Sequence, residues 1–221
     1  EQHCSLIGGH SAESEDLTFG LSVNGFTTQD KMLCKNGMQN GDVLILTKPL
    51  GSGTLLAADM RSKASHSNIQ SALNAMAISN REASSIFVKL KATACTDITG
   101  FGLAGHLLEM LAKDRVEVSI NLDNIPIMDG ARSSLKQGIF SSLHEDNRTV
   151  SSYISHHTNL SKMPKYEILF DPQTSGGLLA SIPSEFAEIC VNQLIGAGYQ
   201  STRVIGRVLC SNTDGPKIII E

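Results

Sequence analysis

The sequence predicts an α+β fold in which a mixed or antiparallel sheet is covered by helices. Short apolar runs that alternate with polar residues predict strands, and amphipathic stretches at helical spacing lie between them. The two kinds of segment interleave without a long regular βαβ repeat, which favours a mixed or antiparallel sheet over a doubly wound parallel one. The chain has 221 residues, enough for one large domain or one and a fraction.

Residues 1–40 start abruptly, as if in the middle of a folded structure. A strand-like run at residues 4–7 leads straight into Gly8-Gly9, and residues 17–26 alternate apolar and polar side chains with the period of a half-buried strand. A polar, turn-rich stretch with two Asn-Gly pairs follows. We therefore expect residues 1–40 to be the trailing part of a truncated N-terminal α+β domain, and residues 41–221 to form a C-terminal domain.

The C-terminal domain is expected to begin with a buried strand and then to alternate helices with strands. Its first half is predicted to contain strand 42–47, helices 54–61 and 68–90, strand 92–98, helix 103–112 and strand 116–122. Residues 126–164 are polar and loosely patterned, which predicts a surface excursion with one short helix near residues 131–136. After it we expect strands 167–170 and 178–182, a helix from Ser184 to about residue 194, and strands 202–208 and 217–220.

Composition excludes several classes of function. The formal net charge is −4 and there is no long basic run, so nucleic acid is not an expected partner. No apolar run approaches the roughly 20 residues that cross a bilayer, and no secretory signal is present, which predicts a cytoplasmic protein. The five cysteines stand far apart without a CxxC pair, which predicts reduced, mostly packed thiols rather than disulfides or a zinc site.

Two glycine-containing turns are candidates for approaching a phosphate. The first consists of Gly8, Gly9, His10 and Ser11. Its glycines permit positive φ and a close ligand approach, although an ordinary turn uses the same residues. The second, residues 47–54, lacks the GxxxxGK[ST] spacing of a P-loop. A joining turn before an N-capped helix explains it better, with Lys48 as a surface or interdomain charge.

Residues 96–106 carry the most informative motif. They read TDITGFGLAGH between a predicted strand and a predicted helix, and they contain a formal GxGxxG. Asp123 ends the next strand about twenty residues later, as in a dinucleotide-binding fingerprint. A nucleotide (NAD)-dependent oxidoreductase that uses this GFGLAG loop is therefore one alternative.

Asp97 counts against that alternative. A Rossmann strand is apolar up to its first glycine, whereas here Thr96, Asp97 and Thr99 place polar groups beside the loop, and a bare carboxylate would repel a pyrophosphate. A divalent cation between Asp97 and phosphate groups resolves the conflict, because Mg²⁺ is held by one or two carboxylates plus phosphate oxygens. Asp97 could also simply cap the following helix.

Two further features are weaker. The turn DPQTSGG at residues 171–177 combines a proline, two hydroxyls and two glycines, which suits a tight strand connection more than a direct ligand contact. His156-His157 is interpreted as a solvated pair, since no Cys or carboxylate stands at ligand spacing. His106 is interpreted as a packed or capping histidine.

Taken together, these motifs resemble the selenophosphate synthetases (selenide, water dikinases) of the aminoimidazole-ribonucleotide synthetase superfamily. Six segments occur in the order and spacing of that family: LIGGHSAE at 6–13, FGLSVNG at 19–25, LTKPLGSG at 46–53, TDITGFGLAGHLLEM at 96–110, DPQTSGGLL at 171–179 and IGRV at 205–208. The resemblance spans nearly the whole chain and identifies it as the C-terminal two-thirds of such a protein.

The resemblance implies a homodimeric α+β enzyme that uses ATP, selenide and Mg²⁺ to make selenophosphate, AMP and phosphate, for selenocysteine and selenouridine synthesis. It implies that Asp97 is a Mg²⁺ ligand and that Gly8, Gly9, His10 and Ser11 contact the nucleotide. The family's nucleophilic Cys or Sec, its nearby Lys and further Asp ligands precede the Gly-Gly-His turn, and none of them is found in residues 1–221. No catalytic residue is therefore assigned, and these residues alone are expected to be inactive. A catalytically silent binding homologue is a third alternative.

Overall fold

The computed structural model describes residues 4–113, 115–156, 160–211 and 217–221. The chain divides into two compact units, Glu1–Met32 and Leu33–Glu221. The assignment of residues 1–40 to a separate domain stays a prediction.

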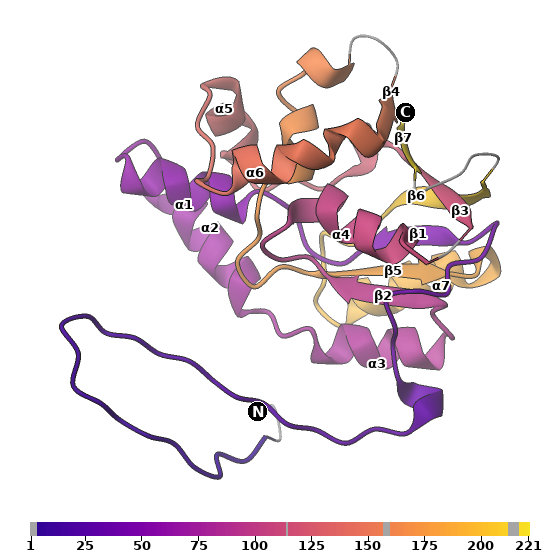
Figure 1. The fold of residues 1–221 in the computed structure, drawn as a ribbon, viewed down its shortest axis with the longest axis horizontal. Helices are drawn as coiled ribbons and strands as arrows, with labels where there is room; N and C mark the ends of the chain where they lie inside the picture. Colours follow the sequence, from indigo (N-terminus) through magenta and orange to yellow (C-terminus); the bar gives the residue numbers. More distant parts are fainter. Residues whose placement is uncertain (1–3, 114, 157–159, 212–216) are drawn as a thin grey trace. The chain divides into compact units, whose positions relative to one another are not determined.

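A seven-stranded sheet forms the centre of the larger unit within the described residues (Figure 1). Its spatial order is β2-β5-β1-β6-β3-β7-β4. The pairs β3–β7 and β7–β4 are parallel and the other pairs are antiparallel, which confirms a mixed sheet and the α+β class. The strands are β1 (Val43–Leu46), β2 (Ala94–Asp97), β3 (Val116–Ile120), β4 (Ile154–His156), β5 (Leu178–Ile182), β6 (Arg203–Cys210) and β7 (Lys217–Ile220).

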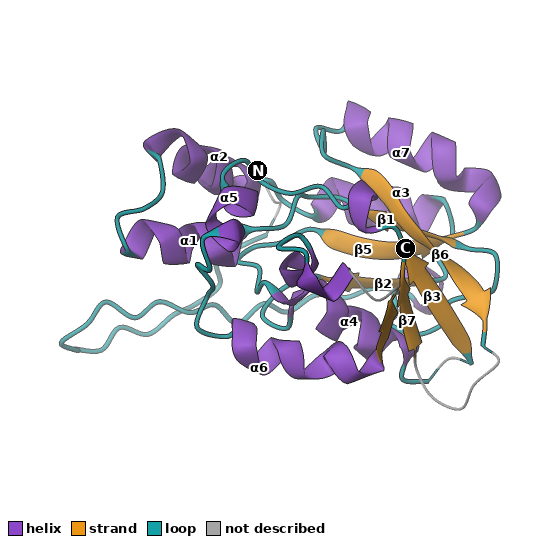
Figure 2. Ribbon diagram, turned by 90° about the horizontal axis from the view of Figure 1, so that it is seen from above, coloured by secondary structure: helices purple, strands orange, loops and turns teal. Residues whose placement is uncertain are grey.

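Helices cover both faces of this sheet, with α3 and α7 on one face and α4 and α6 on the other (Figure 2). A third group, α1, α2 and α5, packs together around Leu55, Ala72 and Ala131. The α-helices are α1 (Ser52–Met60), α2 (His66–Ala77), α3 (Arg81–Lys89), α4 (Gly102–Leu111), α5 (Ala131–Lys136), α6 (His144–Arg148) and α7 (Ala187–Gly196). Short 3-10 helices lie at Gln29–Lys31, Leu122–Asn124, Thr149–Tyr153, Leu160–Lys162, Tyr166–Phe170 and Ser184–Phe186.

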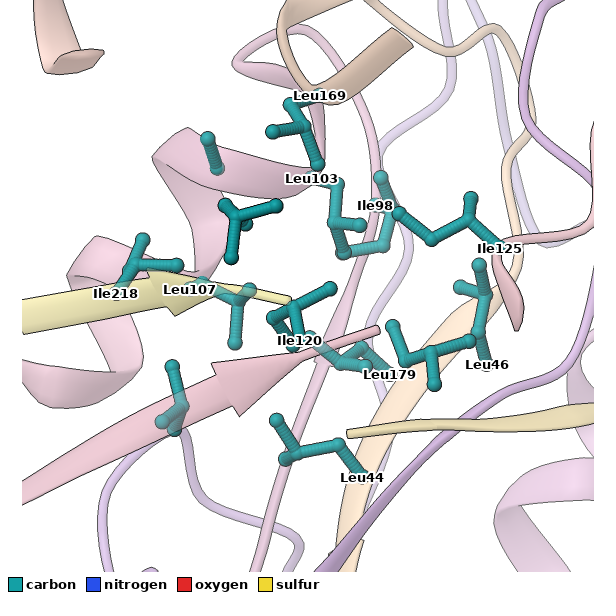
Figure 3. Close-up of a cluster of buried hydrophobic side chains, with 14 of the residues drawn as sticks. Leu44, Leu46, Ile98, Leu103, Leu107, Ile120, Ile125, Leu169, Leu179 and Ile218 are labelled. Carbon is teal, nitrogen blue, oxygen red and sulfur yellow. The ribbon is translucent and has the colours of Figure 1, made fainter. Parts of the chain in front are cut away.

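The central strand β1 is apolar throughout because both of its faces are buried. Leu44 and Leu46 join the core on the α4 side, which Figure 3 shows together with Leu107 and Leu179. Ile45 points to the other face and joins the core beneath α3 and α7. Alternation along a strand places successive side chains on opposite faces, so a continuous apolar run is what a two-sided core requires.

The helix predicted over residues 68–90 is wrong as a single helix, because the chain breaks between α2 and α3. Ile78 adopts an extended conformation (φ −65°, ψ 121°), and its carbonyl accepts a hydrogen bond from the Lys48 ammonium. Asn80 turns its amide to the Gly176 carbonyl, 2.9 Å away. These long-range contacts end α2, whereas the local apolar pattern continues through the break.

Three other predictions for the larger unit need correction. The strand expected at residues 167–170 is the 3-10 helix Tyr166–Phe170, whose apolar side chains are buried; a short apolar run does not distinguish the two. The excursion at residues 126–164 does contain the predicted α5, but it also supplies α6 and the edge strand β4, which pairs with β7. The helix expected from Ser184 starts as a 3-10 turn and becomes α-helical at Ala187.

The strands predicted at residues 4–7 and 17–26 are not formed. In the described residues up to Thr28 no strand is assigned, and the alternating apolar side chains are 70% to 99% exposed. A strand needs a hydrogen-bonded neighbour and a surface on which to bury its apolar face. Those conditions are not met inside Glu1–Met32. The exposed apolar side chains of residues 17–26 are Leu17, Phe19, Leu21 and Val23.

The core under α3 should dominate stability. Phe87 is fully buried, so Phe87→Ala is expected to lower the free energy of unfolding by about 3–5 kcal/mol. The matched change Phe26→Ala removes an exposed ring and is expected to cost less than about 0.5 kcal/mol. Urea unfolding followed by circular dichroism measures both, and equal losses would contradict the assignment of this core.

Candidate functional site

The turns that the sequence singled out in the larger unit meet at one end of the sheet. In the antiparallel register Asp97 at the end of β2 lies opposite Leu178, and Leu46 at the end of β1 lies opposite Leu179. The turns after β1 and β2 and the turn before β5 therefore emerge side by side. Lys48, Asp97 and Gly177 belong to these three turns.

Asp97 is the last residue of β2, and β2 is an edge strand. Its neighbours Thr96 and Ile98 are buried, whereas Asp97 is exposed. Among the described residues its carboxylate has no hydrogen bond or ion pair, so it does not cap α4. Carboxylate oxygen is the donor that Mg²⁺ prefers, and an exposed, unpaired carboxylate fits that role.

Asp97 would supply one ligand only. In the part of the chain that the structure describes, no group of three or more His, Cys, Asp or Glu side chains is placed to hold a metal ion. A cation at Asp97 would therefore take its remaining ligands from phosphate oxygens, water or other side chains. The assignment of Asp97 as a metal ligand stays a prediction.

The turn after Asp97 is fixed by hydrogen bonds to the DPQTSGG turn. The Ile98 amide donates to the Gly177 carbonyl and the Gln173 amide donates to the Thr99 carbonyl, both at 2.9 Å. Asn147 of α6 bridges the two turns, because its Nδ2 donates to the carbonyls of Gly100 (2.8 Å) and Phe170 (3.0 Å).

Two glycines make this close approach possible. Gly102 has φ +68°, and a Cβ there would lie 2.9 Å from the Leu169 carbonyl oxygen. A Cβ on Gly176 would lie 2.0 Å from the Ile98 carbonyl oxygen. Gly102 and Gly176 are thus required by the close packing around these two turns.

The side chains of Asp171 and Gln173 point into the protein, so their role is structural. Asp171 is fully buried; its Oδ1 accepts from the Thr54 hydroxyl (2.7 Å) and its Oδ2 from the Gln173 amide (2.9 Å). Gln173 Oε1 accepts from the Gly51 amide (3.0 Å), the Ser52 amide (3.3 Å) and the Ser52 hydroxyl (3.1 Å). Both side chains serve the structure of the site, and burial raises the pKa of Asp171 to about 6.

The same contacts explain residues 47–54. The predicted joining turn before a helix is present, but α1 has no cap from its own N-cap residue, Gly51. Gln173, more than a hundred residues later, supplies the capping oxygen. The first amides of α1 are therefore occupied and do not form a free anion site.

Lys48 is neither a surface charge nor an interdomain charge. It is 3% exposed, and its ammonium donates to the carbonyls of Ile78 and Ser175 (3.0 Å). Burial lowers the pKa of Lys48. Ser175 has φ +50°, so a strained turn is held by a buried cation at the C-terminal end of α2.

A pocket of about 610 Å³ opens beside the joined turns. Arg61 lines this pocket, and its guanidinium donates to the Phe140 carbonyl (3.2 Å). Leu56, Ala57 and Met60 of α1 form an apolar part of the wall. The motif turns contribute the lining residues Gly53, Gly100, Pro172, Gln173 and Thr174.

The dinucleotide-binding alternative requires neighbouring parallel strands after the glycine loop. Here β2 pairs with β5 in the antiparallel sense, and three strands separate β2 from β3. Asp123 is engaged by Lys165 at 2.7 Å. This topology excludes a Rossmann site at GFGLAG.

The remaining sequence candidates are not joined to this site by the structure. Gly8, Gly9, His10 and Ser11 are exposed within Glu1–Met32, and their meeting with Asp97 at one site stays a prediction. His157 lies outside the described residues. The prediction of mostly packed thiols is wrong, because Cys4, Cys34 and Cys210 are exposed and only Cys95 and Cys190 are buried. His106 is buried, and its two ring nitrogens contact the Thr99 amide and the Glu109 carboxylate.

Comparison with known families agrees with the fold and the motifs. The family model described as "AIR synthase related protein, C-terminal domain" matches residues 39–218. The chain belongs to this family. The matched segment begins close to residue 41, contains strands β1 to β6 and ends within β7.

Curated relatives confirm the resemblance to selenide, water dikinases. A protein of that name from Bdellovibrio bacteriovorus is 37% identical over 211 residues, which is 95% of this chain and 60% of the relative. "Selenide, water dikinase 2" from Peptoclostridium acidaminophilum is 34% identical over 215 residues, again 95% of the chain and 60% of the relative. This AIR synthase related chain therefore spans about 60% of the length of these relatives.

Solved structures share the fold of this AIR synthase related chain. Hydrogenase maturation protein HypE in complex with ATP has a TM-score of 0.60 at 15% identity, covering 86% of this chain and 50% of that one. Thiamine monophosphate kinase from Aquifex aeolicus has a TM-score of 0.55 at 18% identity, covering 86% and 52%. At these identities the likeness concerns the fold alone.

The buried Asp171 should make stability depend on pH. Its pKa in the folded protein is raised from 3.8 to about 6, so the folded state keeps a proton that the unfolded chain releases between about pH 4 and pH 6. The contribution of Asp171 to the free energy of unfolding should fall by up to about 3 kcal/mol as pH rises through this window, whereas Glu109 and Glu167, whose pKa values are lowered, contribute with the opposite sign. In Asp171→Asn this fall should disappear.

Urea unfolding between pH 4 and pH 7 measures the effect. The matched control is Asp59→Asn, an exposed carboxylate on α1, which should retain the fall. Parallel profiles for the unchanged protein and Asp171→Asn would show that Asp171 titrates normally.

Proposed function

We propose that this chain is part of an ATP-dependent selenide, water dikinase, which forms selenophosphate from selenide and ATP with release of AMP and orthophosphate. The relatives of that name support the proposal, and so does the exposed carboxylate of Asp97 at the fixed turn. Water is consumed in releasing the second phosphate, so the reaction balances as ATP, selenide and water giving AMP, selenophosphate and phosphate.

The chemical argument for the proposal rests on Asp97. Phosphoryl transfer depends on positioning and on neutralising the charge of the phosphates, and Mg²⁺ bound by Asp97 and phosphate oxygens would supply that neutralisation. The chain's own contribution is an exposed carboxylate on a backbone that hydrogen bonds at Ile98 and Thr99 hold in place. Gly8, Gly9, His10 and Ser11 are proposed to contact the nucleotide through backbone amides and the Ser11 hydroxyl.

The wider role is proposed on the same basis. We infer a cytoplasmic homodimer whose product serves selenocysteine and selenouridine synthesis. In the described residues no helix has the length and apolar character of a membrane span. The nucleophilic Cys or Sec and the Lys of the family are not among residues 1–221, so these residues alone are expected to release no AMP.

The decisive experiment tests residues 39–218 in an active context. In the Bdellovibrio bacteriovorus relative, the equivalent segment is replaced by residues 39–218 of this chain, and selenide-dependent AMP release is measured with Mg²⁺ and ATP. The chimera is expected to be active. Asp97→Asn in the chimera should lower the rate about 10²–10³-fold, the usual cost of losing one electrostatic contact to the reacting group.

The control is Asp59→Asn in the same chimera, because Asp59 is exposed on α1 and should leave the rate unchanged. An active chimera that tolerates Asp97→Asn would overturn the role of Asp97. A folded but inactive chimera would favour the silent binding homologue instead.

A further inference from the structure

We propose that His106 is the positioning residue of the Asp97 turn: held in its Nδ1–H tautomer by Glu109 and Lys35, it fixes the turn through the Thr99 amide. This inference deepens the proposed function and rests on it for its catalytic consequence. The anchoring itself concerns only contacts within this chain.

The hydrogen bonds determine the tautomer of His106. The Thr99 backbone amide lies 3.0 Å from His106 Nε2, and an amide N–H can only donate. Nε2 must therefore be the acceptor and carry no proton. The proton of the neutral ring resides on Nδ1, which donates to Glu109 Oε2 at 3.1 Å.

Glu109 and Lys35 maintain this arrangement from the outside. The same Oε2 atom of Glu109 accepts from the Lys35 ammonium at 2.7 Å. The hydrogen bond from Lys35 lowers the pKa of Glu109, so the carboxylate stays ionised and remains an acceptor for Nδ1–H. His106 is 4% exposed and the side chains of Glu109 and Lys35 are partly exposed, so this chain of hydrogen bonds runs from the surface to the partly buried Thr99 amide.

Thr99 transmits the anchor to Asp97. Both backbone groups of Thr99 are engaged, the N–H by His106 and the carbonyl by the Gln173 amide at 2.9 Å. Thr99 follows Asp97 by two residues, and the intervening Ile98 is tied to Gly177. His106 therefore acts together with Gln173 and Gly177 to set the direction in which the chain leaves β2, and with it the placement of the carboxylate. A shift of about 1 Å at a reacting centre can cost about 10²-fold in rate.

Core packing by His106 is the competing explanation, and two substitutions separate the explanations. His106→Leu keeps an apolar side chain of similar size in the buried site but removes the acceptor for Thr99. His106→Gln keeps a side-chain oxygen that can accept from the Thr99 amide. Packing alone predicts that leucine is tolerated at least as well as glutamine, whereas positioning predicts the reverse.

Nuclear magnetic resonance on residues 1–221 tests the anchor without any activity. Nitrogen-15 spectra of the histidine rings should show His106 protonated on Nδ1 and not on Nε2. In His106→Leu the Thr99 amide should exchange with solvent about tenfold faster, relative to the Met110 amide in α4, and His106→Gln should restore most of the protection.

His144→Gln is the matched control, because His144 is also 4% exposed but contacts Glu167 rather than Thr99. It should leave the relative exchange of Thr99 unchanged. A ring protonated on Nε2, or Thr99 exchange in His106→Leu that only follows Met110, would overturn the anchor.

The chimera described above tests the catalytic consequence. His106→Leu should raise the Mg²⁺ concentration for half-maximal AMP release about 10–100-fold, the usual effect of losing a residue that orients a metal ligand, with a smaller change in kcat at saturating Mg²⁺. His106→Gln should restore the Mg²⁺ dependence. An unchanged Mg²⁺ dependence in His106→Leu would overturn the positioning role. Inactivity of the unmodified chimera would instead count against the proposed function, while the magnetic resonance results still decide the anchor.

Discussion

The carboxamide of Gln173 is the interaction on which the rest of the site depends. Its oxygen takes three donors from the start of α1, and its nitrogen donates to Asp171, so one side chain joins a helix N-terminus to the turn before β5. The backbone amide of the same residue holds Thr99. A fully satisfied buried polar network of this kind is rigid, and loss of one member leaves the others unpaired at a cost.

This network accounts for polar residues in places where a core would otherwise be apolar. Asp171 and Thr54 are both fully buried, and each is the other's partner. Lys48 is likewise compensated by carbonyl groups rather than by a carboxylate. Ser175 adopts a positive φ that a non-glycine residue rarely takes, at the place where the two motif turns contact each other. Strain of this kind persists only where surrounding contacts over-determine the conformation.

The sequence was sufficient where local pattern decides the structure. Strands β5 and β7 were predicted with the bounds observed, and β1, β2 and α4 within one or two residues, since each is an apolar or amphipathic run with turn residues near its ends. Asp97 was singled out because a carboxylate beside a glycine loop is unusual. Burial of Lys48 and capping by Gln173 depend on contacts between distant residues, which no local pattern encodes. The same limit explains the break between α2 and α3, set by Lys48 and Asn80.

Strand β2 occupies the outermost position of the sheet, and this position has a consequence for how a catalytic centre can be built there. Its flank is covered only in part, where the Cys95 amide donates to the Cys34 carbonyl. A side chain at the end of an edge strand can be approached both past the end of the strand and from its unpaired side. A site at such a corner can accept groups from another polypeptide surface while the hydrophobic interior stays closed.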